Sequence, residues 1–373
     1  MKRIKKIEIN HFKGLYGKHE IDLTNTGNNL MLYGENGSGK SSVAKAIKFF
    51  FQSSVKDINV VEYENVFVSP GEHNTGYIKL TIGEAGNRHS NLPYLLDNTN
   101  NRQTDALISK ANKIKGFLDY KSLLKTHYLE TGKVNVFRLL VEDLFADFIN
   151  SRTTDTIETD WNKLKQDIRD RRTTEYIALK TDGGLLSQFN EGLQELLDDI
   201  EVKANEIIDY FNYNIKIKLH FNKVTIGREK GFANENIELI VDFFDQENLA
   251  EHHHFLDEAR LTAISIAIYL GAVLSNIQDG YRLLVLDDVF IGLDTSNRLP
   301  FLKILEEKFA DYQIFMTTYD KSWYELVQSE NRLNWEFAEL YIKEEHQNSY
   351  EIPILHNKTD FIDKAEHYLN DVG

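Results

Sequence analysis

The sequence predicts an α/β protein, and three patterns support this fold class. A short apolar strand over 29–33 runs into a glycine-rich stretch, 34–41, and an amphipathic helix follows over 42–51. Late in the chain, 282–289 is a continuous apolar run, which is typical of a parallel strand buried on both faces. The segment 256–274 is apolar nearly all round and therefore predicts a buried helix.

The glycine-rich stretch has the sequence GENGSGKS and fits the pattern G-x-x-x-x-G-K-[ST] of a phosphate-binding P-loop. A strand, a glycine loop and a helix in this order direct backbone N–H groups and a helix N-terminus at a polyphosphate. Lys40 is expected to reach the β- and γ-phosphates of ATP, and the Ser41 hydroxyl to bind Mg²⁺. The alternative is a glycine-rich turn without a ligand, which the flanking strand and helix disfavour. The predicted nucleotide-binding residues are Gly34, Asn36, Gly37, Ser38, Gly39, Lys40, Ser41 and Ser42.

Two carboxylates end the apolar run at 282–289, and with the P-loop they form a Walker A and Walker B pair. Asp287 is placed to hold Mg²⁺ through water. Asp288 is placed where a carboxylate base would orient the attacking water. A pair of carboxylates at a strand end is by itself also a common cap. Given the P-loop, the catalytic residues are predicted to be Asp288, Lys40 and Asp287, with ATP and Mg²⁺ as cofactors.

The composition limits the possible functions. The 373 residues suffice for two or three domain-sized units, and the absence of cysteine excludes disulfides, a Cys-zinc site and a zinc hook. No apolar run reaches 18 residues and no signal peptide is visible, so we expect a cytoplasmic chain without a membrane partner. The net charge of −15 does not attract DNA, which leaves local basic patches at Lys2–Lys18 and Lys163–Arg172 as candidate contacts. A solvated charged face is the favoured interpretation of each patch.

An N-terminal ATPase lobe with Walker A is predicted over 1–150. It is expected to contain strands over 4–10, 18–23, 60–68 and 77–82, a loop over 84–105, and helices over 117–128 and 135–148. The alternation of 4–10 favours a half-buried edge strand.

A helical hairpin insertion is predicted over 151–213. Two long helical patterns, 156–179 and 185–211, are broken by the turn signal Thr181–Gly184. Their heptad spacing favours an antiparallel coiled-coil stub on the order of 35 Å long. Two ordinary amphipathic helices packed on the domain are the alternative.

The C-terminal ATPase lobe is predicted over 214–356, followed by a C-terminal helix in 357–373. Its expected elements are strands over 215–221, 237–243, 282–289 and 313–318, helices over 256–274 and 298–309, and a hairpin over 341–345 and 350–355.

Further segments resemble those of ABC-type ATPases. Gly292–Asp294 resembles the D-loop, and Leu256–Arg260, just before the buried helix, resembles the signature segment. With the N-terminal strand IKKIEINHFKG, the chain resembles the SMC/RecF branch of ABC ATPases over 1–82 and about 250–320. The resemblance implies a P-loop NTPase ABC-type head with a mixed sheet, two lobes and a helical insertion. It also implies a homodimer or higher homo-oligomer in which two engaged heads enclose two ATP molecules.

The sequence departs from the family's motifs at several positions. Asp257 stands in place of the signature serine, where a carboxylate would repel the phosphate of the partner head, and Arg260 could compensate. The Walker B glutamate is replaced by Asp288 and the switch histidine by Tyr319. No Q-loop glutamine is evident, and His127 is a weak candidate for that role. The signature, D-loop, switch and Q-loop candidates are Leu256, Asp257, Glu258, Arg260, Asp294, Tyr319 and His127.

The short insertion excludes long SMC arms, so the head resembles RecF and the compact ATPases of bacterial anti-phage defence. This resemblance implies a slow ATPase whose ATP-dependent head engagement regulates an effector, such as a nuclease or toxin, or senses DNA. The alternative is a RecF-like repair and recombination ATPase that clamps DNA. A third possibility, a P-loop kinase, does not suit the wide spacing of the Walker motifs or the segment Gly292–Asp294.

Overall fold

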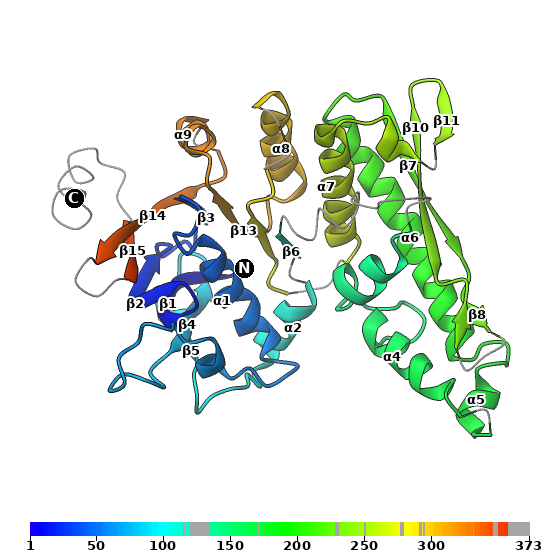
Figure 1. Ribbon diagram of the computed structural model, residues 1–373, viewed down its shortest axis with the longest axis horizontal. Helices are drawn as coiled ribbons and strands as arrows, with labels where there is room; N and C mark the ends of the chain where they lie inside the picture. The colour runs from blue at the N-terminus through cyan, green and yellow to red at the C-terminus, as the bar shows by residue number, and fades with distance from the viewer. Residues whose placement is uncertain are drawn as a thin grey trace. The chain divides into compact units, whose positions relative to one another are not determined.

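A computed structural model gives the structure of the protein (Figure 1). It describes residues 1–114, 116–119, 135–170, 172–227, 231–249, 251–276, 280–290, 293, 295–330, 332–345 and 350–356. The chain forms two compact units. The first comprises Met1–Asp119, Asp279–Phe290 and Leu305–Gly373, and the second Tyr120–Gln278 and Ile291–Ile304. The predicted boundaries at 150 and 213 both fall within the second unit, which contains the predicted insertion together with the signature segment. His127, Asp294 and the helix predicted over 360–369 lie outside the described residues.

The first unit is built on a six-stranded mixed sheet, as predicted for an ABC-type head. Its strand order is β15-β14-β3-β13-β12-β6. The strands are β15 (Tyr350–His356), β14 (Trp335–Glu345), β3 (Asn29–Gly34), β13 (Gln313–Thr318), β12 (Leu283–Asp287) and β6 (Gly116–Asp119). All neighbours are parallel except β14 and β15, which form the predicted antiparallel hairpin. Every residue of β12 and β13 is buried, which explains the continuous apolar run that contains β12.

A second, antiparallel sheet has the order β2-β1-β4-β5. It contains β2 (Leu15–Asp22), β1 (Lys2–Phe12), β4 (Tyr77–Glu84) and β5 (Leu92–Leu96). The P-loop helix α1 (Lys40–Gln52) shares one hydrophobic core with β1, β4 and the central sheet, through residues such as Phe50 and Ile7. The amphipathic pattern of α1 therefore fixes the P-loop against both sheets.

Several local predictions in this unit are wrong. The segment 4–10 is no edge strand, because β1 pairs on both sides, with β2 and β4. The segment 60–68 forms no strand: it begins with a 3₁₀-helix, η1 (Val60–Tyr63), capped by the Asn59 side chain. The loop predicted over 84–105 contains a 3₁₀-helix, η2 (Arg88–Ser90), and strand β5. A helix is predicted over 117–128, but its first residues belong to strand β6, which pairs with β12.

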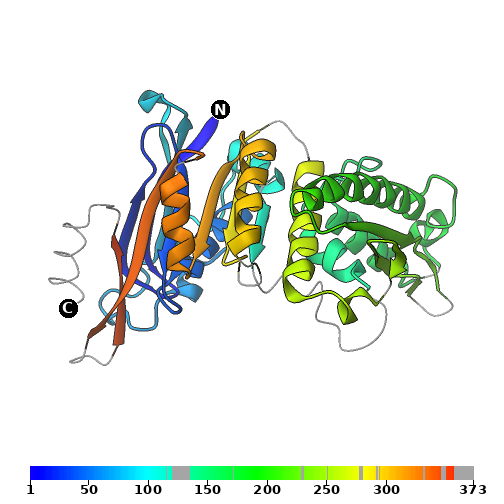
Figure 2. The same ribbon diagram turned by 90° about the horizontal axis from the view of Figure 1, so that it is seen from above.

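Helices cover both faces of the six-stranded sheet. Leu32 of β3 belongs to the core on the α1 side, whereas the neighbouring Tyr33 contacts Tyr324 of α9 (Lys321–Glu330). Because successive strand residues point to opposite faces, α1 and α9 lie on opposite sides of β3. Figure 2 shows α9 lying along β14. The remaining helices around this unit are α2 (Ala106–Ile114) and α8 (Thr295–Lys308), the latter spanning the boundary between the units.

The second unit pairs the long helix α6 (Leu185–Asp209) with α7 (Glu258–Ser275). The helices approach closely at Gly271, where an added Cβ would lie 2.9 Å from the backbone nitrogen of Ala204. The unit also contains the sheet β11-β10-β7 and the ribbon β8-β9. These strands are β7 (Ile215–Asn222), β8 (Thr225–Ile226), β9 (Phe232–Ala233), β10 (Asn236–Phe243) and β11 (Gln246–Leu249).

The predicted coiled-coil stub is not observed. Its first helix divides into α4 (Ile157–Asp167) and α5 (Thr174–Ala178), while α6 packs mainly against α7 and β7. Trp161 of α4 stacks on Phe189 of α6, with ring centroids 5.4 Å apart. The alternative of ordinary amphipathic helices packed on the domain is therefore correct. The helix predicted over 135–148 is observed as a π-helical segment, η3 (Leu139–Leu144).

Helix α7 is long and apolar enough to span a membrane by composition, and it alone has this property among the helices in the described ranges. Most of it is nevertheless buried within the protein, as its uniform apolarity predicts. Its features are those of a core helix.

Candidate nucleotide-binding site

The P-loop connects β3 to α1 and has the backbone that its glycines allow. Gly37 and Gly39 have φ angles of 92° and 99°, in the left-handed region that favours glycine. Gly34 is required for another reason, because a Cβ there would lie 2.9 Å from the carbonyl oxygen of Leu340. Helix α1 starts directly at Lys40, without a side-chain cap at Gly39 and without an acidic residue in its first turn. Such an N-terminus can accept an anion.

The lysine of the loop is buried. Lys40 is only 4% exposed, and its Nζ donates to the carbonyl oxygen of Glu35 at 3.0 Å. The same ammonium lies 3.7 Å from Oδ2 of Asp288. The Oγ of Ser38 is fully buried and, within the described part of the chain, has no hydrogen-bond partner. A phosphate oxygen seated in the loop would satisfy this hydroxyl and the ammonium together, so the residues fit a polyphosphate.

The other predicted loop residues have different environments. Asn36 is exposed at the tip, and Ser41 is partly buried at the second position of α1. Ser42 points elsewhere: its Oγ accepts a hydrogen bond from the backbone N–H of Gly14 at 3.2 Å. The hydroxyl of Ser42 therefore attaches α1 to the turn between β1 and β2.

The two Walker B carboxylates are organised by a threonine on the next strand. The hydroxyl of Thr317 donates to Oδ1 of Asp287 at 2.7 Å and accepts the backbone N–H of Asp288 at 3.1 Å. Asp287 ends β12 and Thr317 lies directly opposite it on β13. One side chain thus fixes the orientation of Asp287 and the start of the turn that carries Asp288.

Asp288 has the features of a reactive group. Its φ of 53° is left-handed, a conformation that aspartate tolerates better than most residues. Its Oδ1 is buried and has no hydrogen-bond partner among the residues that the structure describes. Burial raises the pKa of Asp288 above its ordinary value, and the nearby Lys40 ammonium opposes this shift. Its other oxygen faces Lys40, so the free oxygen could accept a proton.

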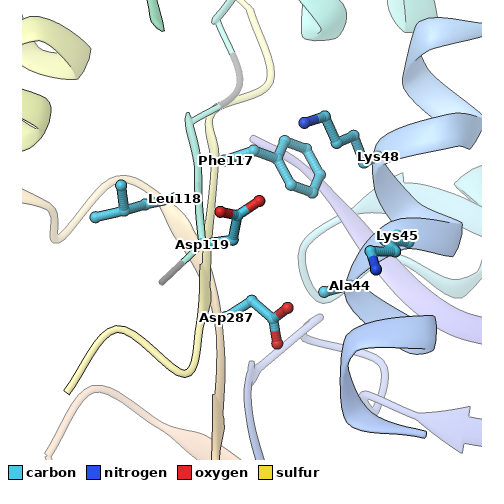
Figure 3. A pocket seen from close by; sticks show the side chains of 7 residues that line it. All are labelled: Ala44, Lys45, Lys48, Phe117, Leu118, Asp119 and Asp287. Carbon is cyan, nitrogen blue, oxygen red and sulfur yellow. The ribbon is translucent and has the colours of Figure 1, made fainter. Parts of the chain in front are cut away.

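A pocket beside α1 contains an additional carboxylate. Asp119 ends β6 in register with Asp287, and both side chains line the pocket. Figure 3 shows the two carboxylates between the strands and α1, which contributes Lys45 and Lys48. No group of three His, Cys, Asp or Glu with metal-binding geometry occurs in the described ranges.

The sequence matches the family model described as "RecF/RecN/SMC N terminal domain" over residues 3–337. The chain belongs to this family. None of the curated proteins matches it. This RecF/RecN/SMC-type chain is also similar in fold to the Smc head domain from Pyrococcus furiosus, which was solved with an extended coiled coil and bound to the C-terminal domain of ScpA. The two chains are 14% identical, the match covers both chains in full, and the TM-score is 0.52. A second solved structure, an SmcHead bound to the C-winged helix domain of ScpA, has 11% identity, covers 97% of this chain and 99% of that one, and has a TM-score of 0.46.

The signature-like segment of this RecF/RecN/SMC-type chain begins α7. Leu256 is buried, and the Asp257 side chain caps the helix by accepting the backbone N–H of Arg260 at 2.9 Å. The Arg260 guanidinium also pairs with the Asp257 carboxylate. It lies 5.3 Å from the ring centroid of Tyr213 and 5.5 Å from that of Phe243. The structure therefore pairs Arg260 with Asp257, in the arrangement expected if the arginine compensates for the carboxylate.

The remaining candidates are only partly placed. Glu258 is exposed at the first position of α7. Tyr319 follows β13, and its side chain is 40% exposed. His127 and Asp294 lie outside the described residues.

Two residues of this region escaped the sequence analysis. Thr317 was only part of the predicted strand 313–318, and Asp119 was assigned to a helix. A strand reading of the run Gly116–Asp119, which ends in a carboxylate as Leu283–Asp287 does, was the signal that could have identified Asp119.

Proposed function

We propose that the protein is an ABC-type ATPase of the SMC/RecF kind that binds and hydrolyses ATP. The observation that carries this proposal is the arrangement of Lys40, held between a P-loop carbonyl and Asp288, beside the buried, unpartnered hydroxyl of Ser38. Lys40 and the N-terminus of α1 would hold the phosphates. ATP turnover by the purified protein, compared with the Lys40→Ala variant, tests the proposal.

In the proposed reaction, water attacks the γ-phosphorus and the bond to the ADP oxygen breaks. The free oxygen of Asp288 accepts the proton of the attacking water, and Lys40 stabilises the charge on the phosphate oxygens. Ser41 and Asp287 would hold Mg²⁺, which neutralises charge on the β- and γ-phosphates when bound. Thr317 keeps Asp287 oriented through its hydroxyl, so the two aspartates have separate roles.

We infer that Asp119 assists Asp287 on the cation side of the site, because the two carboxylates are adjacent in register and line one pocket. Asp119→Asn is expected to raise the Mg²⁺ concentration needed for half-maximal turnover by about tenfold, as the loss of outer-shell ligand partners does. A titration of turnover with Mg²⁺ at saturating ATP measures this. The control is Glu62→Gln, which neutralises a carboxylate on η1 in the same unit. If Asp119→Asn left the Mg²⁺ requirement unchanged, Asp119 would not belong to the site.

We further propose that ATP-dependent engagement of two heads regulates an effector protein or senses DNA, as in anti-phage defence. The head from Pyrococcus furiosus was solved with a bound partner domain, which supports a partner-binding role by analogy of fold. The acidic net charge of −15 disfavours non-specific DNA binding and thus favours a protein effector. The alternative is a RecF-like ATPase that clamps DNA. Co-purification of a nuclease or toxin would support the first function, and ATP-dependent retention on DNA the second.

The role of Arg260 in head engagement can be tested by removing its charge, alone or together with the charge of Asp257. Arg260→Ala leaves the Asp257 carboxylate uncompensated, so we expect ATP-dependent assembly and turnover to fall about tenfold while ATP binding is retained. The double variant Asp257→Ser/Arg260→Ala removes both charges and is expected to recover assembly. Sedimentation with ATP, and turnover against protein concentration, measure these effects. If Arg260 were an ordinary surface charge, the effect would stay within about 0.5 kcal/mol.

A further inference from the structure

A fully buried carboxylate lies on the opposite face of the sheet from α1. Glu339, on β14, has no exposed surface. Its Oε1 accepts a hydrogen bond from the Lys321 ammonium at 3.1 Å, and its Oε2 accepts one from the Tyr341 hydroxyl. A carboxylate in this position is costly unless it is paired and hydrogen-bonded, so the surrounding groups are organised around it.

The lysine of this pair is constrained by more than its charge. The Lys321 ammonium lies 4.5 Å from the ring centroid of Tyr33 and 5.2 Å from that of Tyr324. The two tyrosine rings are 5.5 Å apart, and burial together with Glu339 raises the pKa of Tyr324. Lys321 is therefore held by one anion and two aromatic faces, although its side chain is 39% exposed.

At one end, this cluster adjoins the strand that enters the P-loop. Glu339 is the register partner of Tyr33, and Leu340 is the partner of Gly34. Gly34 already approaches the backbone of Leu340 so closely that a side chain could not be added. The position of Glu339 is consequently fixed relative to the first glycine of the loop.

At the other end, the cluster adjoins the turn that follows Thr317, whose hydroxyl accepts the backbone N–H of Asp288 at 3.1 Å. Lys321 is the first residue of α9, directly after the turn that joins β13 to α9. In this turn the Thr318 hydroxyl accepts the N–H of Asp320 at 3.1 Å, and Asp320 caps α9 through the N–H of Trp323 at 3.1 Å.

We propose that Lys321 and Glu339 are positioning residues that fix the Thr318–Asp320 turn relative to the P-loop strand, and thereby set the place of the Asp288 carboxylate. Neither residue touches the nucleotide in this proposal, which rests on the proposed function of Asp288 as the base. The pair acts on the geometry of the chemical step rather than on the affinity for ATP.

The test is a split between turnover and binding. Lys321→Met should lower kcat about tenfold while the Kd for ATP changes by no more than about threefold, because a displaced base slows chemistry without altering the phosphate contacts. The neutral pair Lys321→Met/Glu339→Gln avoids an uncompensated buried charge and should show the same split. Lys321→Arg keeps the cation and should restore most of the turnover.

Arg332→Met is the matched control, because it removes a cation near the far end of α9, where the ion pair with Glu306 is exposed. Turnover equal to that of the wild type in both Lys321→Met and Lys321→Met/Glu339→Gln would overturn the proposal. An equal loss of ATP affinity and kcat would also overturn it, since the pair would then shape the P-loop strand. If the wild type turned over no faster than Lys40→Ala, the proposed function itself would fail, and with it the step that this pair is proposed to position.

Discussion

Replacing Lys40 with alanine is expected to weaken ATP binding by at least about 100-fold, which corresponds to about 2.7 kcal/mol. The ammonium is almost fully buried and lies between the Glu35 carbonyl and Asp288. No other described cation occupies this position in the loop, so the charge of the phosphates would be left without its main compensation. Hydrolysis should disappear together with binding.

The measurement is the thermal stabilisation of the protein by ATP, with titration calorimetry for the affinity. A ligand that binds only the folded state stabilises it by RT ln(1 + [L]/Kd), so the ATP-dependent shift in melting temperature should vanish in Lys40→Ala at ATP concentrations below the weakened Kd. Lys110→Ala, on the exposed surface of α2, is the matched control and should keep the full shift. ATP affinity and turnover that remain unchanged in Lys40→Ala would contradict the P-loop interpretation.

The parts of the site that could be predicted from the sequence are those specified locally. The glycines, Lys40 and the strand–loop–helix order are contiguous, and the left-handed angles of Gly37 and Gly39 follow from the motif alone. The carboxylates of Asp287 and Asp288 could be predicted because an apolar strand precedes them directly. Family membership followed from the same contiguous motifs, and the family model confirms it.

The parts that could not be predicted depend on partners distant in sequence. The run after Gly116 is compatible with a helix by itself, and only its pairing with β12 makes it a strand and brings Asp119 beside Asp287. Likewise, nothing local distinguishes Glu339 from a surface glutamate. Its burial arises because β14 pairs with β3 while α9 covers that face.

The helical insertion was misjudged for a related reason. Heptad spacing in 185–211 is real, but the apolar face of α6 is covered by α7 and β7 of the same unit rather than by a partner coiled-coil helix. The sequence reports that a face is apolar, not which element covers it.

Asp288→Asn is the second variant with a large expected effect. It should lower turnover by about 10²–10⁴-fold, the usual contribution of a positioned proton acceptor. Asparagine is nearly isosteric with aspartate and equally tolerant of the left-handed φ of 53°, so the turn should keep its shape. Asp287 would still be held by Thr317 and would retain its place on the cation. The variant is therefore expected to bind ATP and to accumulate the ATP-bound assembly, which size-exclusion chromatography with ATP would detect.

Two companion variants separate the roles of the neighbouring carboxylates. Asp287→Asn should weaken Mg²⁺-dependent ATP binding as well as turnover, because it removes one of the carboxylates on the cation side of the site. Asp288→Glu keeps a proton acceptor and should retain more turnover than Asp288→Asn, even with an added methylene. If Asp288→Asn hydrolysed ATP at the wild-type rate, another group would have to orient the water. If it lost ATP binding as fully as Lys40→Ala, the role of Asp288 would be to hold the lysine, 3.7 Å away, rather than to accept a proton.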